Sequence, residues 1–458
     1  MKRIASVLFA LGGAFFAAEA RGAAFDCGFT VVPAGGSAYS VLFDSVAGFF
    51  ADRLSPAVCD IAVPVTPVVL GAGEFAVYKA DYRGFLLQGG TGRITVANSG
   101  ATTGATVPAV DEDHNGLYLE SYAAAIPGDA TLNSSIMLEL LGYDPSAPDT
   151  IFTLDSIDYL LVRTTATDIQ TSVDQFAANH TSLITHLNAT ADLLTGAGQK
   201  LEQDDGVTAL AGLGSFTLGA TGRRNLDGGF TLLGGAAVFD QSAGGSTASG
   251  LLLSGSLRYI APGDGFVRPY GEIGLISAPA MGLSFTRSYV TSTGTTTATG
   301  SGVGALYGGF VKGGALVAPN ADNEIVFAAT LAKDWLLTGA YTETLSGSNL
   351  FAASAPAQSS SFDTVKVGVD WTTKLVPKTE LTLSAALGAT IAENAVATNV
   401  AFAGVFNGAP KSEGFAEYGA RVAYEIDPAQ TIGAFIHGST GQYSGTHVQV
   451  GGDFHVRF

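Results

Sequence analysis

Asp111-Glu112-Asp113-His114 is the segment whose residue types are best suited to chemistry. Asp111 and His114 have an Asp-x-x-His spacing that could provide the orienting acid and the base of an ester-hydrolysing serine. The Gly-Asp-Ser-Leu string that would supply this serine near the N-terminus is absent, and the nearest string, Phe43-Asp44-Ser45, lacks the preceding Gly. No nucleophile can be placed within reach of a base, so we expect no catalytic residues and no enzyme activity.

The same acidic run could bind Ca²⁺ through its carboxylates. It departs from the Asp-x-Asp-x-Asp-Gly loop, and a run of this kind usually forms a solvated loop. The six histidines are scattered along the chain, and a lone His180 on an apolar helix face is expected to be a packing residue rather than a ligand. We therefore expect no metal site and no cofactor.

The C-terminal residues alternate strictly between apolar and polar side chains. One face holds Val448, Val450, Gly452, Phe454, Val456 and Phe458, and the other holds Gln449, Asp453, His455 and Arg457. Side chains of a strand point alternately to opposite faces. The pattern therefore predicts a long amphipathic β-strand, of the kind found in membrane barrels, that ends in phenylalanine.

Residues 1–24 have the features of a cleaved secretory signal peptide: Lys2 and Arg3 at the start, an apolar stretch, and then small residues. Cleavage after Ala20 and cleavage after Ala24 both fit. The apolar core of about 15 residues is shorter than the roughly 20 that a membrane helix needs. No comparable apolar run follows, so any membrane span must be a β-barrel.

Composition agrees with a barrel. The chain has 60 Gly in 458 residues, 14% charged residues and a mean hydropathy of +0.31 without a long apolar run. Alternating strands explain this, since only every second residue of a barrel strand faces lipid. The formal charge of −18 argues against a nucleic-acid partner, because neutralising phosphates requires Lys and Arg.

Cys27 and Cys59 are the two cysteines of the chain. An even number of cysteines in an oxidising compartment predicts one disulfide between them; two free buried thiols are the alternative. The residues before Cys27 lack the small-residue pattern of a lipoprotein attachment site, so lipidation is not expected.

Three regions follow the signal peptide. Residues 25–164 are β-leaning, broken by Gly, Pro and Asn, and large enough for a core of their own. In residues 165–205 the period changes to that of an amphipathic helix, which Gly196 and Gly198 would end or interrupt. Its apolar stripe is formed by Ile169, Val173, Phe176, Leu183, Leu187 and Leu194, together with His180 and Thr190.

Residues 206–458 contain twelve or thirteen alternating segments, and the even strand number of bacterial barrels favours twelve. The fold class is therefore all-β, with a transmembrane antiparallel β-barrel at the C-terminus. The low-complexity stretches 288–302 and 352–361 are expected to be long external loops. The expected interfacial aromatic residues are Tyr259, Tyr270, Trp335, Tyr341, Trp371, Tyr418, Tyr424 and Phe454.

This order of parts resembles the classical (type V) autotransporters, and the terminal aromatic strand resembles the C-terminal signature of bacterial outer-membrane proteins. The resemblance implies that residues 25–164 are a passenger carried to the cell surface and that the helix threads the barrel lumen. It also implies that Phe454, Val456 and Phe458 form the signal for the barrel-assembly machinery. The polar wall would face the helix and water, and it comprises Arg268, Glu272, Lys366, Asp370, Glu417, Arg421, Asp453 and Arg457.

The chain departs from the resemblance at two points. Residues 25–164 lack the repeats of a β-helix passenger. Members that cleave themselves commonly use an Asn-Asn pair inside the pore, whereas Asn179 and Asn188 stand alone. We therefore expect an uncleaved domain tethered at the surface.

Three functions follow from the sequence. The first is a monomeric outer-membrane autotransporter, embedded in lipid, that displays its small N-terminal domain for adhesion or another contact with an unknown surface ligand. The second is a porin-like channel whose N-terminal domain stays in the periplasm. The third is a structural barrel without a transport role.

The terminal signal leads to the first prediction. Deleting Phe458, or replacing it with a polar residue, should impair insertion into the outer membrane while export to the periplasm continues. Fractionation of cells, with heat-modifiability of the barrel on gels as the assembly assay, measures both steps. Normal insertion of the Phe458 deletion would contradict the assignment of the signal.

Overall fold

The computed structural model describes residues 29–458 except 36–37, 44–48, 51–56, 89, 100, 108–116, 144–150, 154–155, 197–198, 202, 215 and 264. The signal peptide, Cys27, Asp44-Ser45 and the run 111–114 lie outside these described residues. The chain divides into two compact units. The first is the chain up to Ala166 with residues 291–294 and 346–350, and the second is the remainder.

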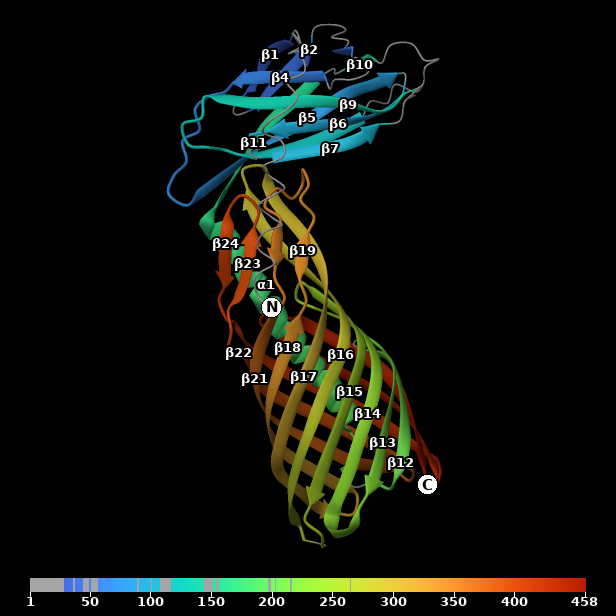
Figure 1. The fold of residues 1–458 in the computed structure, drawn as a ribbon. Coiled ribbons are helices and arrows are strands. Elements are labelled where there is room, and N and C mark those ends of the chain that lie inside the picture. The colour runs from blue at the N-terminus through green and yellow to red at the C-terminus, as the bar shows by residue number, and fades with distance from the viewer. Residues whose placement is uncertain are drawn as a thin grey trace, which may run out of the picture. The chain divides into compact units, whose positions relative to one another are not determined.

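The first unit consists of two antiparallel sheets (Figure 1). One has the order β1-β2-β11-β5-β10-β3, with β8 also paired to β5, and the other has the order β4-β9-β6-β7. A β-rich N-terminal domain was expected and is confirmed. Its strands are β1 (Phe29–Gly35), β2 (Ala38–Phe43), β3 (Phe49–Phe50), β4 (Ala57–Pro64), β5 (Glu74–Gln88), β6 (Gly90–Asn98), β7 (Ala101–Val107), β8 (Leu117–Ala124), β9 (Thr131–Tyr143), β10 (Ile151–Thr153) and β11 (Ser156–Thr165).

The core of this unit combines apolar residues with a small polar network. Val41, Ile61 and Ile157 are buried there. The Ser134 hydroxyl lies 3.0 Å from the Tyr82 hydroxyl and 2.6 Å from that of Tyr159. Burial raises the pKa of both tyrosines above its usual value, because a buried phenolate would lose its hydration.

Cys59 is fully buried in β4 within the same core. Its expected partner, Cys27, lies outside the described residues. The disulfide between them therefore stays a prediction.

The second unit is a barrel with one helix, α1 (Ala166–Leu194), inside it (Figure 1). A short 3-10 helix, η1 (Asp227–Gly229), lies between two strands. The strands are β12 (Gly206–Leu213), β13 (Phe216–Asn225), β14 (Phe230–Ala243), β15 (Ser246–Ile260), β16 (Val267–Thr291), β17 (Gly294–Asn320), β18 (Asn323–Thr338), β19 (Tyr341–Glu343), β20 (Ala353–Ala355), β21 (Gln358–Val376), β22 (Thr379–Ala392), β23 (Val396–Val400), β24 (Gly404–Gly408), β25 (Ser412–Asp427), β26 (Gln430–Gly441) and β27 (Gly445–Arg457).

Pairing of the first and last strands closes the barrel. β12 runs antiparallel to β27 from Gly206↔Arg457 to Leu213↔Val450. Twelve of the described strands form the closed wall, as expected, while β19, β20, β23 and β24 extend the sheet at one end. Each of these twelve described wall strands has a paired neighbour on both sides, which a sheet surrounded by lipid requires.

The strands carry apolar residues outward and polar residues inward, as their alternation predicts. In β25, Tyr418, Val422 and Tyr424 are each more than two-fifths exposed, whereas Glu417 and Arg421 are buried. In β27 the outward residues are Val448, Val450, Phe454 and Val456, and the buried inward residues are Gln449, Asp453 and His455. An apolar exterior on a closed barrel defines a membrane-spanning wall.

Two expectations about the barrel were wrong. Residues 288–302 belong to the hairpin of β16 and β17, which turns only at 292–293, and residues 353–355 and 358–361 belong to β20 and β21. Their Thr, Ser and Gly residues hid the strand signal because the outward face here is polar rather than apolar. Tyr270 and Tyr341 are buried in the lumen instead of forming part of an interfacial girdle, because both hydroxyls donate to inward-facing glutamates.

The helix begins at the expected position but ends at Leu194, before the expected bound of 205 and just before Gly196, which the sequence indicated as a stop. It starts directly after β11, and its last turn is followed by Gly196 with a φ of +88°, a conformation that favours glycine. Among the described residues, no helix has the length and apolarity needed to cross a membrane.

The outward face leads to a second prediction. Val367 lies in the middle of the outward row of β21, so Val367→Arg should cost about 2–4 kcal/mol of unfolding free energy in lipid vesicles. Asp240 is also outward-facing but lies beyond the apolar row of β14, and Asp240→Arg should cost about 0–1 kcal/mol. Urea unfolding monitored by tryptophan fluorescence measures both, and equal costs would argue against an apolar belt.

Candidate functional site: the filled barrel lumen

The lumen is the candidate site, and α1 fills it along its length. The residues of the expected apolar stripe are all at most 2% exposed. The opposite face is buried as well, for example at Asn179, Ser182 and His186. From Phe176 to Leu194 no residue of the helix is exposed, because the barrel wall encloses it, whereas its first turns keep an exposed side at Thr167, Thr171 and Gln175.

Asp192 connects the C-terminal half of the helix to three strands of the wall. Its carboxylate accepts from Lys312 of β17 at 2.6 Å and from Lys366 of β21. Lys366 also donates to Glu417 of β25 at 2.9 Å. We call Asp192, Lys312, Lys366 and Glu417 the Asp192 clamp; none of these side chains is more than 17% exposed.

A cation closes the C-terminal end of the helix. Arg258 donates to the main-chain oxygen of Thr195 at 2.9 Å and to Glu272 at 2.9 Å. Ser256 and Tyr270 donate to the same glutamate at 2.7 and 2.8 Å. A guanidinium beside the free carbonyls of a helix C-terminus is favourable, since this end carries partial negative charge.

Another buried ion pair lies near the N-terminal half of the helix. Arg287 of β16 is fully buried and donates to both carboxylate oxygens of Glu343, at 3.0 and 2.8 Å. It also donates to the Ser172 hydroxyl of the helix at 2.8 Å and to the Phe351 carbonyl at 2.6 Å. One side chain thus joins α1, β16 and two segments of the barrel extension.

Two aromatic rings of the barrel, Phe285 and Tyr341, pack against the helix at this level. Phe176 packs against Phe285 with ring centroids 5.1 Å apart and against Tyr341 at 4.8 Å. His180 lies edge-on to Phe285 at 4.6 Å. His180 is thus a packing residue of the lumen, as the sequence indicated.

Polar groups of the helix also bond to the hairpins of the wall. Asn179 donates to the Thr286 carbonyl at 3.0 Å and accepts from the Gly245 amide at 3.2 Å. Asp174 pairs with Lys411 at 3.0 Å and accepts from the Ala409 amide at 3.0 Å. The Asp174–Lys411 pair is about a quarter exposed, unlike the Asp192 clamp.

Asn188 bonds to the Asp334 carboxylate, which occupies the space left by the missing side chain of Gly308. Its amide donates to Asp334 at 2.8 Å, and Asp334 is fully buried. A Cβ atom at Gly308 would collide with the Asp334 carboxylate. Gly308 therefore gives an inward-facing acid room to reach the helix.

The segment that follows the helix contacts the barrel wall near the C-terminal end of the helix. The Leu201 amide donates to Glu324 at 2.7 Å, and Arg223 donates to the Leu201 carbonyl. A cavity of about 130 Å³ remains at the C-terminal end of the helix, and it is lined in part by Asp192, Lys366 and Arg421. Arg421 is itself held by a two-point pair with Asp453 at 2.9 and 2.7 Å.

The sequence located part of this site. Of the expected polar wall, Glu272, Glu417, Arg421 and Asp453 are buried in the lumen. Arg258, Arg287 and Glu343 were missed, although their inward positions in alternating strands could have indicated them. Among the described residues, no group of three or more His, Cys, Asp or Glu side chains is placed to hold a metal ion.

No family model and no curated protein matches this chain. Its fold is similar to the translocator domain of the autotransporter NalP from Neisseria meningitidis, with 14% identity, a TM-score of 0.42, and coverage of 62% of this chain and 99% of that one. The β domain of the Bordetella autotransporter BrkA has 15% identity, a TM-score of 0.33 and coverage of 56% and 99%. The NanC porin has 11% identity, a TM-score of 0.31 and coverage of 56% and 100%.

These TM-scores are low, so the description of the barrel rests on its own strand pairings and its apolar exterior. By those criteria the fold is that of an outer-membrane β-barrel whose lumen holds a helix.

The Asp192 clamp leads to a third prediction. Removing one member of a buried ion pair leaves an uncompensated charge and typically costs about 3–5 kcal/mol. Asp192→Asn should therefore loosen the helix and raise the frequency and size of openings in planar-bilayer recordings. Asp174→Asn removes a pair that is about a quarter exposed and worth about 0–1 kcal/mol, so it should leave the recordings close to those of the wild type. Equal recordings from the two variants would contradict the clamp.

Proposed function

We propose that this chain is an outer-membrane autotransporter that displays its own N-terminal domain at the cell surface. The direction of α1 through the lumen supports this proposal. The N-terminal half of the helix bonds to Lys411, Ala409 and Thr286. Its C-terminal end bonds to Arg258 and is followed by the start of β12.

The two ends of the barrel differ in the length of their connections. Near the helix N-terminus, β18 and β21 are joined through residues 339–357, and β22 and β25 through residues 393–411. At the opposite end the connections are short, such as 321–322, 377–378 and 428–429. Barrels of the bacterial outer membrane have short periplasmic turns and longer extracellular loops, so the helix N-terminus would open to the outside.

The residues before the helix would then be extracellular, which is the arrangement needed for display. We infer a non-catalytic role in adhesion or another surface contact, in a monomer that depends on lipid and on the barrel-assembly machinery. A porin-like channel is the alternative, but a lumen occupied by a pinned helix disfavours free passage of solutes.

Protease shaving of intact cells, with an epitope inserted after Ala24, provides the fourth prediction. The epitope should disappear while the barrel stays protected, because the N-terminal domain is exposed and the wall is embedded in lipid. A second epitope in the short turn at 428–429 serves as the matched control and should be cleaved only after the outer membrane is opened.

Protection of the first epitope until the membrane is opened would place the N-terminal domain in the periplasm. That result would overturn display and favour the channel. Cleavage of both epitopes on cells that retain periplasmic markers would contradict the assigned orientation of the barrel.

A further inference from the structure

A polar cavity of about 560 Å³ lies in the barrel lumen, at the end that has the short connections. The Lys and Arg side chains that line it are Lys200, Lys374, Lys378, Arg421 and Arg457. Three Asp or Glu side chains also line it, so cations are in excess even though Arg421 is already paired with Asp453. This excess contrasts with the formal charge of −18 of the whole chain, and a cleft lined by an excess of one charge concentrates ions of the opposite charge.

Three hydrogen-bond donors of this cavity have no partner among the residues that the structure describes. They are Nε2 of His455, Nε of Arg457 and the hydroxyl of Thr431, and all three atoms are buried. His455 as a whole is 6% exposed. Its Nδ1 lies 2.9 Å from the Thr208 hydroxyl, and when that hydroxyl donates, the proton of the neutral ring is on Nε2. Buried donors without an acceptor cost free energy, so a ligand that accepts from them would be favoured.

The strand register brings these donors together. Thr431 lies directly opposite His455 in β26 and β27, and Arg457 is the next residue on the same face of β27. Gly206 of β12 is opposite Arg457. A Cβ atom at Gly206 would collide with the His455 ring. The glycine therefore leaves room for the imidazole to lean along the strand toward Arg457.

The other contacts of the cations leave these donors available. Arg457 donates through Nη1 to the Pro428 carbonyl at 3.1 Å and lies 3.6 Å from Asp204, and neither contact involves Nε. Lys374, at the rim of the cavity, is 3.9 Å from Asp322 and 47% exposed. Its ammonium is therefore free to approach a ligand.

Lys378 provides a second cation at the rim, from the turn between β21 and β22. Its φ is +68°, a conformation that favours glycine. Strained positions of this kind cluster at functional sites. Its ammonium lies 3.5 Å from the Ile426 carbonyl, and its side chain lines the cavity. The cavity thus combines buried donors with exposed cations at its entrance.

We propose that this cavity binds a phosphate group, with His455, Arg457 and Thr431 donating to its oxygens. Lys374 and Lys378 would supply further positive charge at the rim. Three donors and two ammonium groups suit a phosphate with its charge of about −1.5 to −2 better than a single carboxylate. The cavity faces the lumen, so its occupant comes from the aqueous side, either as free phosphate or as the phosphomonoester of a small solute.

Isothermal titration calorimetry of the full chain in non-ionic detergent at neutral pH tests this fifth prediction, with inorganic phosphate and glycerol 3-phosphate as the two ligands. One phosphate should bind per chain. Arg457→Gln and His455→Phe should each weaken binding about tenfold or more, because a hydrogen bond to a charged group is lost. Tighter binding of inorganic phosphate would support the free ion as the occupant, and tighter binding of glycerol 3-phosphate would support a phosphomonoester.

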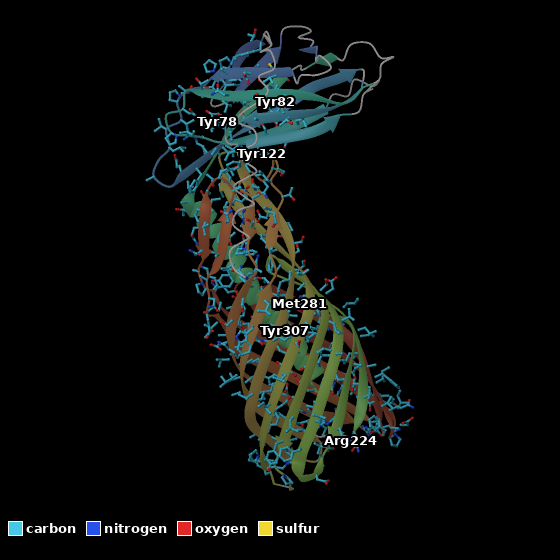
Figure 2. All side chains as sticks on the ribbon, in the orientation of Figure 1. Tyr78, Tyr82, Tyr122, Arg224, Met281 and Tyr307 are labelled. Carbon is cyan, nitrogen blue, oxygen red and sulfur yellow. The ribbon has the colours of Figure 1, made fainter. Side chains whose placement is uncertain are left out.

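Two further variants separate binding from folding and from general charge. Lys374→Gln/Lys378→Gln alters only exposed side chains, so the barrel should assemble, and its binding should be weaker and less dependent on salt. Arg224, labelled in Figure 2, is 65% exposed at the same end of the barrel. It does not line the cavity, so Arg224→Gln should bind phosphate like the wild type.

Heat-modifiability on gels verifies that each variant has a folded barrel. Absence of phosphate binding by the wild type would overturn the proposal, as would equal binding by the wild type, Arg457→Gln and the double lysine variant. The purified chain binds or fails to bind phosphate whichever side of the membrane holds its N-terminal domain, so this result and the shaving result can fail independently.

Discussion

The need to satisfy every backbone hydrogen bond inside lipid governs this molecule. A sheet in the hydrocarbon layer cannot leave an edge exposed, and the ladder between β12 and β27 removes the last edge. Once the sheet closes, each strand has one face toward lipid and one toward an enclosed lumen. The alternation of apolar and polar residues along each strand is then required by the environment on its two faces. A register shift of one residue would place Glu417 or Arg421 in lipid.

Closure creates a second demand, since the enclosed space must be filled or hydrated. A long polar helix meets this demand, and its contacts explain its unusual composition. Ser172, Asn179, Thr185 and Asn188 each bond to the wall or to the helix itself, and Asp192 joins two lysines. Ion pairs of this kind contribute little net stability compared with apolar packing, but they define one position of the helix, because removal of either partner is costly.

The sequence predicted the wall better than the contents of the lumen. Strands such as β25 and β27 are evident because lipid on one side and water or charge on the other impose a strict period. The hairpin of β16 and β17 was misjudged where both faces lose that contrast, since Thr and Ser face outward around residues 288–302 while Ala298 and Tyr289 face inward. Arg287 and Glu343 pair only because the topology joins β16 to β19 through β17, and such long-range contacts leave no mark on local pattern.

The passage of α1 through a closed ring also has a mechanical consequence. The helix continues at its C-terminus into β12, a stave of the ring that surrounds it, and at its N-terminus into β11 of a folded two-sheet unit. A folded sheet structure is wider than a single helix. While the first unit stays folded, it therefore cannot be drawn through the barrel behind the helix. A pulling force on the first unit would travel along covalent bonds into the wall, and the tether would hold even if every salt bridge in the lumen were broken.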